Sequence, residues 1–323
     1  MLHDAPAIAT ANLTKRYGSV TALAGIDLLV SRGVTYGFLG PNGAGKTTTI
    51  RILMGFIRPS GGSARIWGHD CWRDGVQARQ DLGFLVPADS LHDDMSGFAQ
   101  LDYAAHLSGK PPLLRQRLLE ALELSQDALG RRLRTYSKGM KQKLALTVAI
   151  QTAPALLVLD EPTDGLDPLI QRAFETVLGE LRDAGTTIFM SSHDLPEVER
   201  TCERVAIIRA GAIVAEETIG DLKGRHRRAA EVVFAGEPPS GLDRLPGVTI
   251  VARDGNCLIL AIDGSVVPLL QFLGTRHDVR DLLLPQPRLD DIFLGFYDLS
   301  PAVGEEPAMR LHTSAPEAVA VER

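Results

Sequence analysis

The chain of 323 residues is longer than one hydrophobic core usually organises, so two domains are expected. The net charge of −6 and the pI near 5.8 argue against a nucleic-acid backbone as main partner. The three cysteines lie far apart and form no C-x-x-C pair, so neither a zinc site nor a disulfide framework is indicated. No apolar run approaches the roughly 20 residues that span a bilayer, and the N-terminus lacks a signal-peptide pattern. A cytoplasmic location is therefore expected.

Residues 8–30 have the pattern of two antiparallel strands, joined by a tight turn near Gly18. Tyr17 lies at this turn. Its ring could stack on an adenine face, because every base presents a flat π surface. Packing of the ring against its own sheet is the alternative, and the sequence leaves both open.

A glycine-rich segment at residues 40–48 matches G-x-x-x-x-G-K-[ST], the loop that cradles nucleotide phosphates. A buried strand is expected before it at 34–39, and a helix after it at 47–54 would point its positive end at the phosphates. Lys46 would reach the β- and γ-phosphates, and the Thr47 hydroxyl would ligate Mg²⁺. The expected nucleotide-binding residues of this loop are Gly40, Pro41, Asn42, Gly43, Ala44, Gly45, Lys46, Thr47 and Thr48.

The middle of the chain changes from strand-like to helical periodicity. Short strands are expected at 64–67 and 82–86, and helices at 97–109 and 113–124, which Pro111 and Pro112 separate. An all-helical insert is therefore predicted between two strand-rich regions.

Residues 155–159 are apolar at every position, as in a strand buried on both faces of a parallel sheet. The run ends in Asp160 and Glu161, where open α/β sheets place their ligands. Asp160 suits Mg²⁺ binding through its water shell, and Glu161 suits orienting and polarising an attacking water. A solvated acidic pair is the alternative.

A second buried strand at 186–190 follows an amphipathic helix at 169–184 and leads to His193. Because this strand shares a sheet edge with Asp160 and Glu161, a contact from His193 to the γ-phosphate is predicted. Asp194 is expected to cap the next helix, and residues 205–215 to form a hairpin.

In this order the motifs resemble those of an ABC transporter ATPase, over about residues 7–225. The resemblance assigns residues 40–48 to the Walker A loop, 136–140 to the signature motif and 156–161 to the Walker B strand, with His193 as the switch histidine. It implies an α/β P-loop NTPase fold of ABC type, with a mixed sheet core, an N-terminal antiparallel β subdomain and a helical subdomain at about 88–153. The implied catalytic residues are Glu161, His193 and Lys46, with ATP and Mg²⁺ as cofactors.

The resemblance also implies a head-to-tail dimer with a second copy or a homologous ATPase. The residues expected to meet the opposite subunit's nucleotide are Ser137, Gly139, Met140 and Asp167. In an isolated monomer the segment 136–140 is better interpreted as an ordinary helix start capped by Ser137.

Two departures from the family pattern stand out. Lys138 and Met140 replace the usual second glycine and glutamine of the signature, a form similar to that of ATPases paired with separate drug-, lipid- or polysaccharide-exporting permeases. Pro87 stands where the family usually has a Mg²⁺-sensing glutamine. Asp89 or a water molecule would have to replace it, and the sequence does not decide between them.

In the family, residues 83–107 face the membrane partner, which is a polytopic permease. The candidate docking residues here are equally well explained as core: Phe84, Leu91, Met95, Phe98 and Tyr103.

The C-terminal part has strand-like alternation at 229–235, 248–253, 257–262 and 279–284, with helices at 266–273 and 289–299. It predicts a small α+β accessory domain at 229–299 without a catalytic constellation. Residues 288–294 resemble the C-terminal extension of exporter-type ATPases. The basic run at 225–228 is a solvated linker or touches anionic lipid, and 300–323 is expected to be disordered.

These inferences predict the ATP-hydrolysing subunit of an exporter, held on the inner face of the cell membrane by its permease. One alternative is a soluble ABC-type ATPase acting in translation or DNA repair. The single ATPase unit, the lack of a long heptad run and the acidic pI argue against it. The missing glutamine keeps a third possibility open, a nucleotide-binding regulator without turnover.

Overall fold

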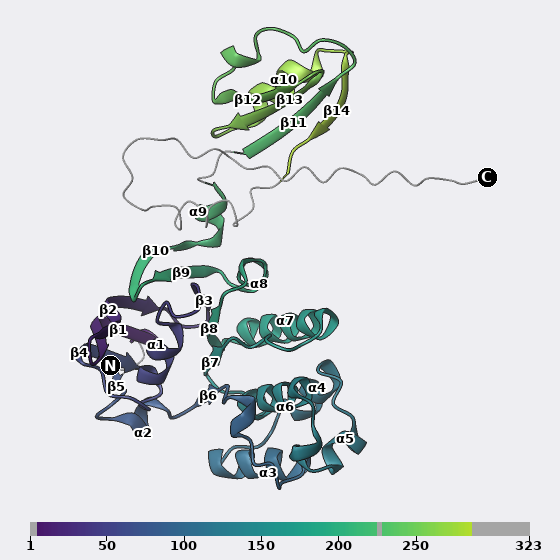
Figure 1. Ribbon diagram of the computed structural model, residues 1–323. Coiled ribbons are helices and arrows are strands. Elements are labelled where there is room, and N and C mark those ends of the chain that lie inside the picture. The colour runs from purple at the N-terminus through teal and green to yellow at the C-terminus, as the bar shows by residue number, and fades with distance from the viewer. Residues whose placement is uncertain (1–4, 225–227, 286–323) are drawn as a thin grey trace.

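The computed structural model describes residues 5–224 and 228–285 (Figure 1). At its centre lies a six-stranded sheet in the order β10-β9-β3-β8-β7-β6. Its strands are β3 (Thr35–Leu39), β6 (Leu82–Phe84), β7 (Leu156–Asp160), β8 (Thr187–Ser192), β9 (Arg204–Arg209) and β10 (Ala212–Thr218). All neighbours pair in parallel except β10, which is antiparallel to β9. The carboxyl ends of β3, β8 and β7 therefore meet at one edge.

The central strands are buried on both faces because alternate side chains enter two different cores. In β7, Leu157 and Leu159 join the core formed with the helices, whereas Leu156 and Val158 join the core under the N-terminal sheet. This explains why the run is apolar at every position, as the sequence predicted.

The N-terminal sheet is antiparallel, in the order β2-β1-β4-β5. It consists of β1 (Ile8–Tyr17), β2 (Val20–Val30), β4 (Gly61–Ile66) and β5 (His69–Asp70). Helix α1 (Lys46–Leu53) lies between β3 and β4 in the chain, and α2 (Gly75–Ala78) comes after β5. The register of β1 with β2 pairs Tyr17 with Val20, so the predicted hairpin and its turn are confirmed.

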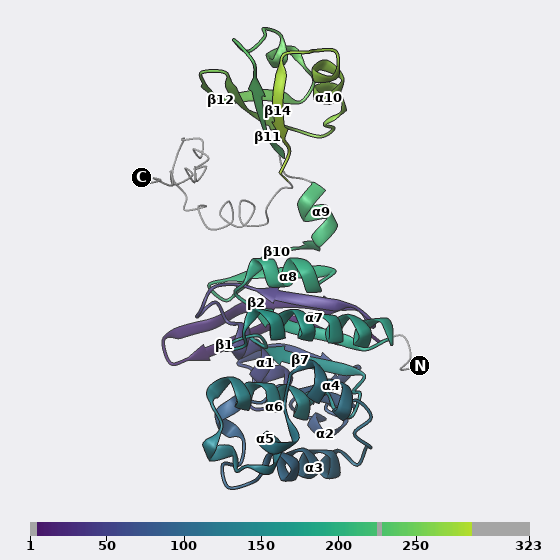
Figure 2. The same ribbon diagram turned by 90° about the vertical axis from the view of Figure 1, so that its right-hand side faces the viewer.

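The predicted helical insert is also confirmed. It contains η1 (Ala88–Ser90), α3 (Gly97–Ser108), α4 (Arg115–Ala121), α5 (Gln126–Gly130), η2 (Leu133–Thr135) and α6 (Lys138–Ile150). The α-helices gather below β7 in both views (Figures 1 and 2). Three of them begin at serines whose hydroxyls accept a bond from the N–H three residues later, namely Ser96, Ser125 and Ser137.

The remaining helices of this half are α7 (Pro168–Asp183), α8 (Leu195–Thr201) and α9 (Ile219–Gly224). Asp167 caps α7, since its Oδ1 accepts from the Ile170 N–H at 3.1 Å. The predicted capping of α8 by the Asp194 side chain is wrong. The Asp194 N–H instead donates to the Ser192 hydroxyl at 2.9 Å. The start of α8 is thus held by a serine that precedes the helix.

The C-terminal residues form a third sheet, antiparallel in the order β12-β13-β11-β14. Its elements are β11 (Arg228–Phe234), η3 (Leu242–Arg244), β12 (Val248–Asp254), β13 (Cys257–Ile262), α10 (Val267–Gly274) and β14 (Val279–Leu283). Because this sheet buries a core of its own, we propose a domain boundary just after α9. The predicted helix at 289–299, the 288–294 motif, the tail at 300–323 and most of the basic run at 225–228 lie outside the described residues.

No helix within the described ranges is long and apolar enough to cross a membrane. The three cysteines are free, with Cys71 and Cys202 buried and Cys257 half-buried. Burial raises the pKa of the Cys71 and Cys202 thiols to about 12, so both behave as small apolar side chains.

Candidate active site

The loop between β3 and α1 has the backbone of an anion cradle. Gly43 and Gly45 have φ of 82° and 117°, in the left-handed region that favours glycine. A Cβ on Gly40 would lie 2.3 Å from the carbonyl oxygen of Ile208, so the loop packs too closely on β9 for any side chain there. Within the described residues, the N–H groups of Gly43, Gly45 and Thr47 donate to no backbone carbonyl. These donors are therefore available to phosphate oxygens.

Lys46 begins α1 and is 5% exposed. Its ammonium donates to the Gly40 carbonyl oxygen at 2.5 Å and lies 3.0 Å from Glu161 Oε1. The phosphate loop and the carboxyl end of β7 are thus joined by one buried ion pair. Such a pair is costly to break on one side, because the remaining charge is left without a partner.

Asp160 is the last residue of β7, and its Oδ1 accepts a hydrogen bond from the Ser191 hydroxyl at 2.5 Å. The Thr47 side chain is exposed at the start of α1. A carboxylate and a hydroxyl are hard oxygen donors, which suit Mg²⁺. The residues present therefore fit the predicted ion.

Glu161 follows Asp160 with φ of 48°, which is unusual for a residue other than glycine. Its N–H donates to the Ser191 hydroxyl and carbonyl oxygens at 3.1 and 3.2 Å, and these bonds hold the conformation. Backbone strain of this kind costs on the order of 1–3 kcal/mol and gathers at functional sites. Here it turns the carboxylate back toward the phosphate loop.

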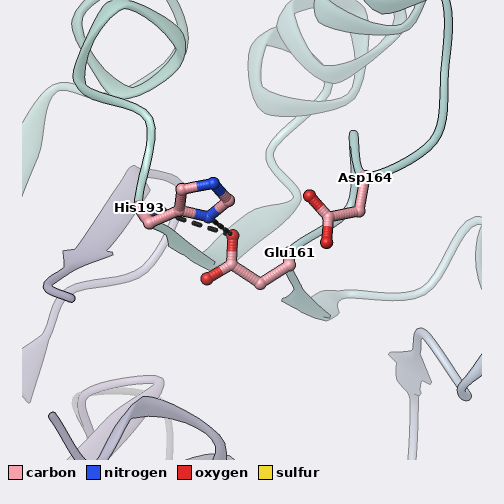
Figure 3. A group of neighbouring side chains, drawn as sticks. All are labelled: Glu161, Asp164 and His193. Carbon is pink, nitrogen blue, oxygen red and sulfur yellow. Dashed lines mark hydrogen bonds and ion pairs between the residues drawn. The ribbon is translucent and has the colours of Figure 1, made fainter. Parts of the chain in front are cut away.

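His193 follows β8 and lies between the phosphate loop and β7 because β8 pairs with both strands. Its Nδ1 lies 2.7 Å from Glu161 Oε2. Figure 3 marks the hydrogen bonds between these two residues with dashed lines. This hydrogen bond, with the negative charge behind it, raises the pKa of His193. The structure thus brings Lys46, Glu161 and His193 together, as the sequence predicted.

Asp164 is a site residue that the sequence analysis missed. Its carboxylate, that of Glu161 and the His193 ring each place a possible ligand atom within 4.8 Å of the others (Figure 3). The only signal in the sequence was its place three residues after Glu161. The negative charge of Asp164 also contributes to the raised pKa of His193.

The signature segment contacts the loop after β7. Gln142 Nε2 donates to the Pro162 carbonyl oxygen at 2.8 Å, and a Cβ on Gly139 would lie 3.0 Å from the Gly165 carbonyl oxygen. Ser137 caps α6 through the Met140 N–H at 3.2 Å. Among the described residues, no hydrogen bond or ion pair joins these signature residues to the phosphate loop of the same chain.

The remaining predicted residues lie apart from this cluster. Tyr17 is 48% exposed, with Lys15 Nζ 4.9 Å from its ring centroid, so its ring is not buried against the sheet. Asp89 is exposed in η1, and no bond within the described ranges joins it to Lys46 or Glu161.

The candidate docking residues divide between core and surface. Leu91 is buried in the core of the insert, and Phe84 packs on the core under the N-terminal sheet. Phe98 and Tyr103 are 36% and 41% exposed on α3, whereas Met95 is half-buried. Only the two α3 aromatics remain available as a surface.

Comparison with known proteins places this geometry in a family. The family model for ABC transporters matches residues 23–164. The chain is 36% identical over 301 residues to the daunorubicin/doxorubicin resistance ATP-binding protein DrrA of Streptomyces peucetius, covering 89% of this chain and 91% of the relative. It belongs to the ABC transporter family. This ABC protein is an ATP-binding ATPase.

Other relatives of this chain are also named as ATP-binding proteins. A fluoroquinolones export ATP-binding protein of Mycobacterium tuberculosis is 33% identical, with 87% of this chain and 90% of the relative covered. The bacitracin transport ATP-binding protein BcrA of Bacillus licheniformis is 35% identical, with 69% and 74% covered. Among solved structures, an ATP-binding subunit of an ABC transporter matches with a TM-score of 0.62 and 29% identity over 67% of this chain and 91% of that chain. The predicted P-loop fold of ABC type is confirmed.

Proposed function

We propose that this chain is the ATP-hydrolysing subunit of an exporter and drives a separately encoded polytopic permease from the cytoplasmic face of the membrane. Three relatives named for drug resistance, drug export or bacitracin transport support this reading. The class of cargo suggested by those names is an antibiotic or a similar drug. The single observation that carries the ATPase chemistry is the Glu161 carboxylate held between Lys46 and His193.

Nucleotide binding would exchange the partners of Lys46. The triphosphate carries more negative charge than one carboxylate, so the ammonium moves its interaction from Glu161 to the β- and γ-phosphates. Glu161 is then free to orient and polarise the attacking water, while His193 contacts the γ-phosphate. The ion pair between Lys46 and Glu161 thus keeps the Glu161 carboxylate bound to the lysine until ATP binds.

Mg²⁺ would be held by the Thr47 hydroxyl and, through water, by Asp160. When bound, the ion neutralises charge on the phosphate oxygens. The hydrogen bond from Ser191 fixes the Asp160 carboxylate, and the same serine accepts from the Glu161 N–H. One hydroxyl therefore aligns both carboxylates.

The complete site requires a partner subunit. Ser137 and Gly139 lie at the N-terminus of α6, a helix of 13 residues whose first N–H groups suit an anion. We propose that they close over ATP bound to a second copy or a homologous ATPase, with Met140 beside them. Asp167 would take part from the adjoining loop, although here its carboxylate caps α7.

The partner is tested by recovering the tagged full-length chain from detergent-solubilised membranes. We expect a polytopic membrane protein that, reconstituted with this chain in lipid vesicles, raises its ATP turnover severalfold. Recovery of ribosomal proteins or DNA-repair factors, with no stimulation by any membrane protein, would contradict the exporter assignment and favour a soluble ABC-type ATPase.

A further inference from the structure

A buried carboxyl group lies behind the active site and takes no part in the chemistry described above. Glu197, in the first turn of α8, is 2% exposed. Its Oε2 accepts a hydrogen bond from the Ser192 hydroxyl at 2.6 Å, and its Oε1 has no hydrogen-bond partner among the described residues. A buried charge with an unpaired oxygen is strongly disfavoured, so this position demands an explanation.

The contacts of Glu197 join the two loops that carry the catalytic side chains. The Ser192 hydroxyl that donates to Glu197 also accepts from the Asp194 N–H at 2.9 Å, so one hydroxyl holds the backbone on both sides of His193. The Thr163 side chain, two residues after Glu161, faces the same carboxyl group and favours its ionised form. Glu197 is therefore hydrogen-bonded at the end of β8, next to His193, and faces the loop after β7.

The surroundings of Glu197 favour its neutral form. Burial, together with the charges of Asp194 and Glu161, raises its pKa to about 7, against the opposing effect of the Ser192 and Thr163 hydroxyls. Arg200 does not neutralise it fully, because its guanidinium already makes three hydrogen bonds to Glu175 on α7.

The two strands packed on α8 supply no counter-charge. Helix α8 packs on β3, β8 and α7. Strands β3 and β8, with the sequences TYGFL and TIFMSS, carry no charged side chain. The titratable and charged groups that interact with Glu197 are Glu161, Asp194, Arg200 and Cys202.

We infer that Glu197 is a positioning residue, which as a neutral carboxylic acid holds the Glu161 and His193 loops in register for hydrolysis. This inference rests on the proposed ATPase function. It assigns Glu197 no contact with ATP or water. Ionisation would place an unpaired charge beside Glu161 and Asp194, and the two loops would separate to solvate it.

The sign of the pH effect follows from the direction of the shift. Because folding raises the pKa of Glu197, the neutral acid predominates below about pH 7 and the ionised form above it. Glutamine has the same shape and stays neutral at every pH. The advantage of Glu197→Gln over the wild type should therefore grow as the pH rises.

The test compares kcat and KM for ATP of the wild-type chain, Glu197→Gln and the control Glu199→Gln, from pH 6 to 8.5. We expect the ratio of kcat in Glu197→Gln to kcat in the wild type to be near one at pH 6 and to rise on the order of tenfold by pH 8.5. KM should stay within about twofold, because the phosphate loop is untouched, and Glu199→Gln should follow the wild type. A ratio that does not change with pH, or a Glu197→Gln chain that binds ATP yet turns over far more slowly at every pH, would overturn the inference.

A second measurement does not depend on the variant folding or on turnover. Infrared spectra of the wild-type chain should show a protonated carboxyl band that persists above pH 6 and disappears with a midpoint near pH 7. Absence of that band would overturn the inference even if the chain hydrolyses ATP. Presence of the band with no ATP turnover under any condition would instead count against the proposed function.

Discussion

Glu161→Gln is expected to lower ATP turnover by roughly 10²–10⁴-fold, because an amide cannot accept the proton of the attacking water. ATP should still bind, since the phosphate loop and Lys46 are unchanged. The variant also lacks the negative charge that pairs with Lys46 in the nucleotide-free chain. We therefore expect ATP affinity equal to or slightly above that of the wild type.

Steady-state phosphate release and equilibrium binding of ATP separate these two effects. Glu180→Gln is a matched control, because Glu180 is a half-exposed carboxylate on α7 that pairs with Arg117 away from the site. It should keep wild-type turnover. Turnover in Glu161→Gln within about threefold of the wild type would remove Glu161 from its assigned role.

Lys46→Ala has the second large expected effect, on binding. We expect the dissociation constant for ATP to rise on the order of 100-fold, which corresponds to about 3 kcal/mol. The reason is the loss of a buried ammonium that no water molecule replaces as a charged donor. Without it, the Glu161 carboxylate is also left facing the incoming phosphates.

Titration calorimetry with ATP measures this loss directly. Lys110→Ala is the control, because the Lys110 ammonium pairs with Asp81, which precedes β6, at the opposite edge of the sheet. Its ATP affinity should match that of the wild type. An unchanged affinity in Lys46→Ala would refute the assignment of residues 40–48 as the phosphate-binding loop.

Most of the fold and the centre of the site could be predicted from sequence. Apolar runs such as 155–159 are buried on both faces, and parallel strands bring their carboxyl ends to one edge. This is why Lys46, Glu161 and His193, far apart in the chain, were expected to meet. The positions of these residues at the ends of predicted strands were enough to predict their proximity, without any knowledge of side-chain contacts.

Two of the residues that were missed, Glu197 and Gln142, are buried, and the local sequence does not reveal burial. Glu197 looks like an ordinary acidic residue in the first turn of a helix, where acids are favoured in solvent. Its burial depends on how α8 packs on β3 and β8. Gln142 is likewise 8% exposed and donates to the Pro162 carbonyl oxygen, a long-range contact that its local sequence does not indicate.

The central claim is that two copies of this chain enclose ATP between the phosphate loop of one and the signature segment of the other. Sedimentation of Glu161→Gln with and without ATP tests it most directly, alongside the double variant Glu161→Gln, Ser137→Arg. The account predicts that ATP converts the 34.9 kDa monomer into a dimer holding two ATP, and that the double variant binds ATP but stays monomeric. A chain that binds ATP and remains a monomer at saturating nucleotide, or a double variant that dimerises equally well, would contradict the account.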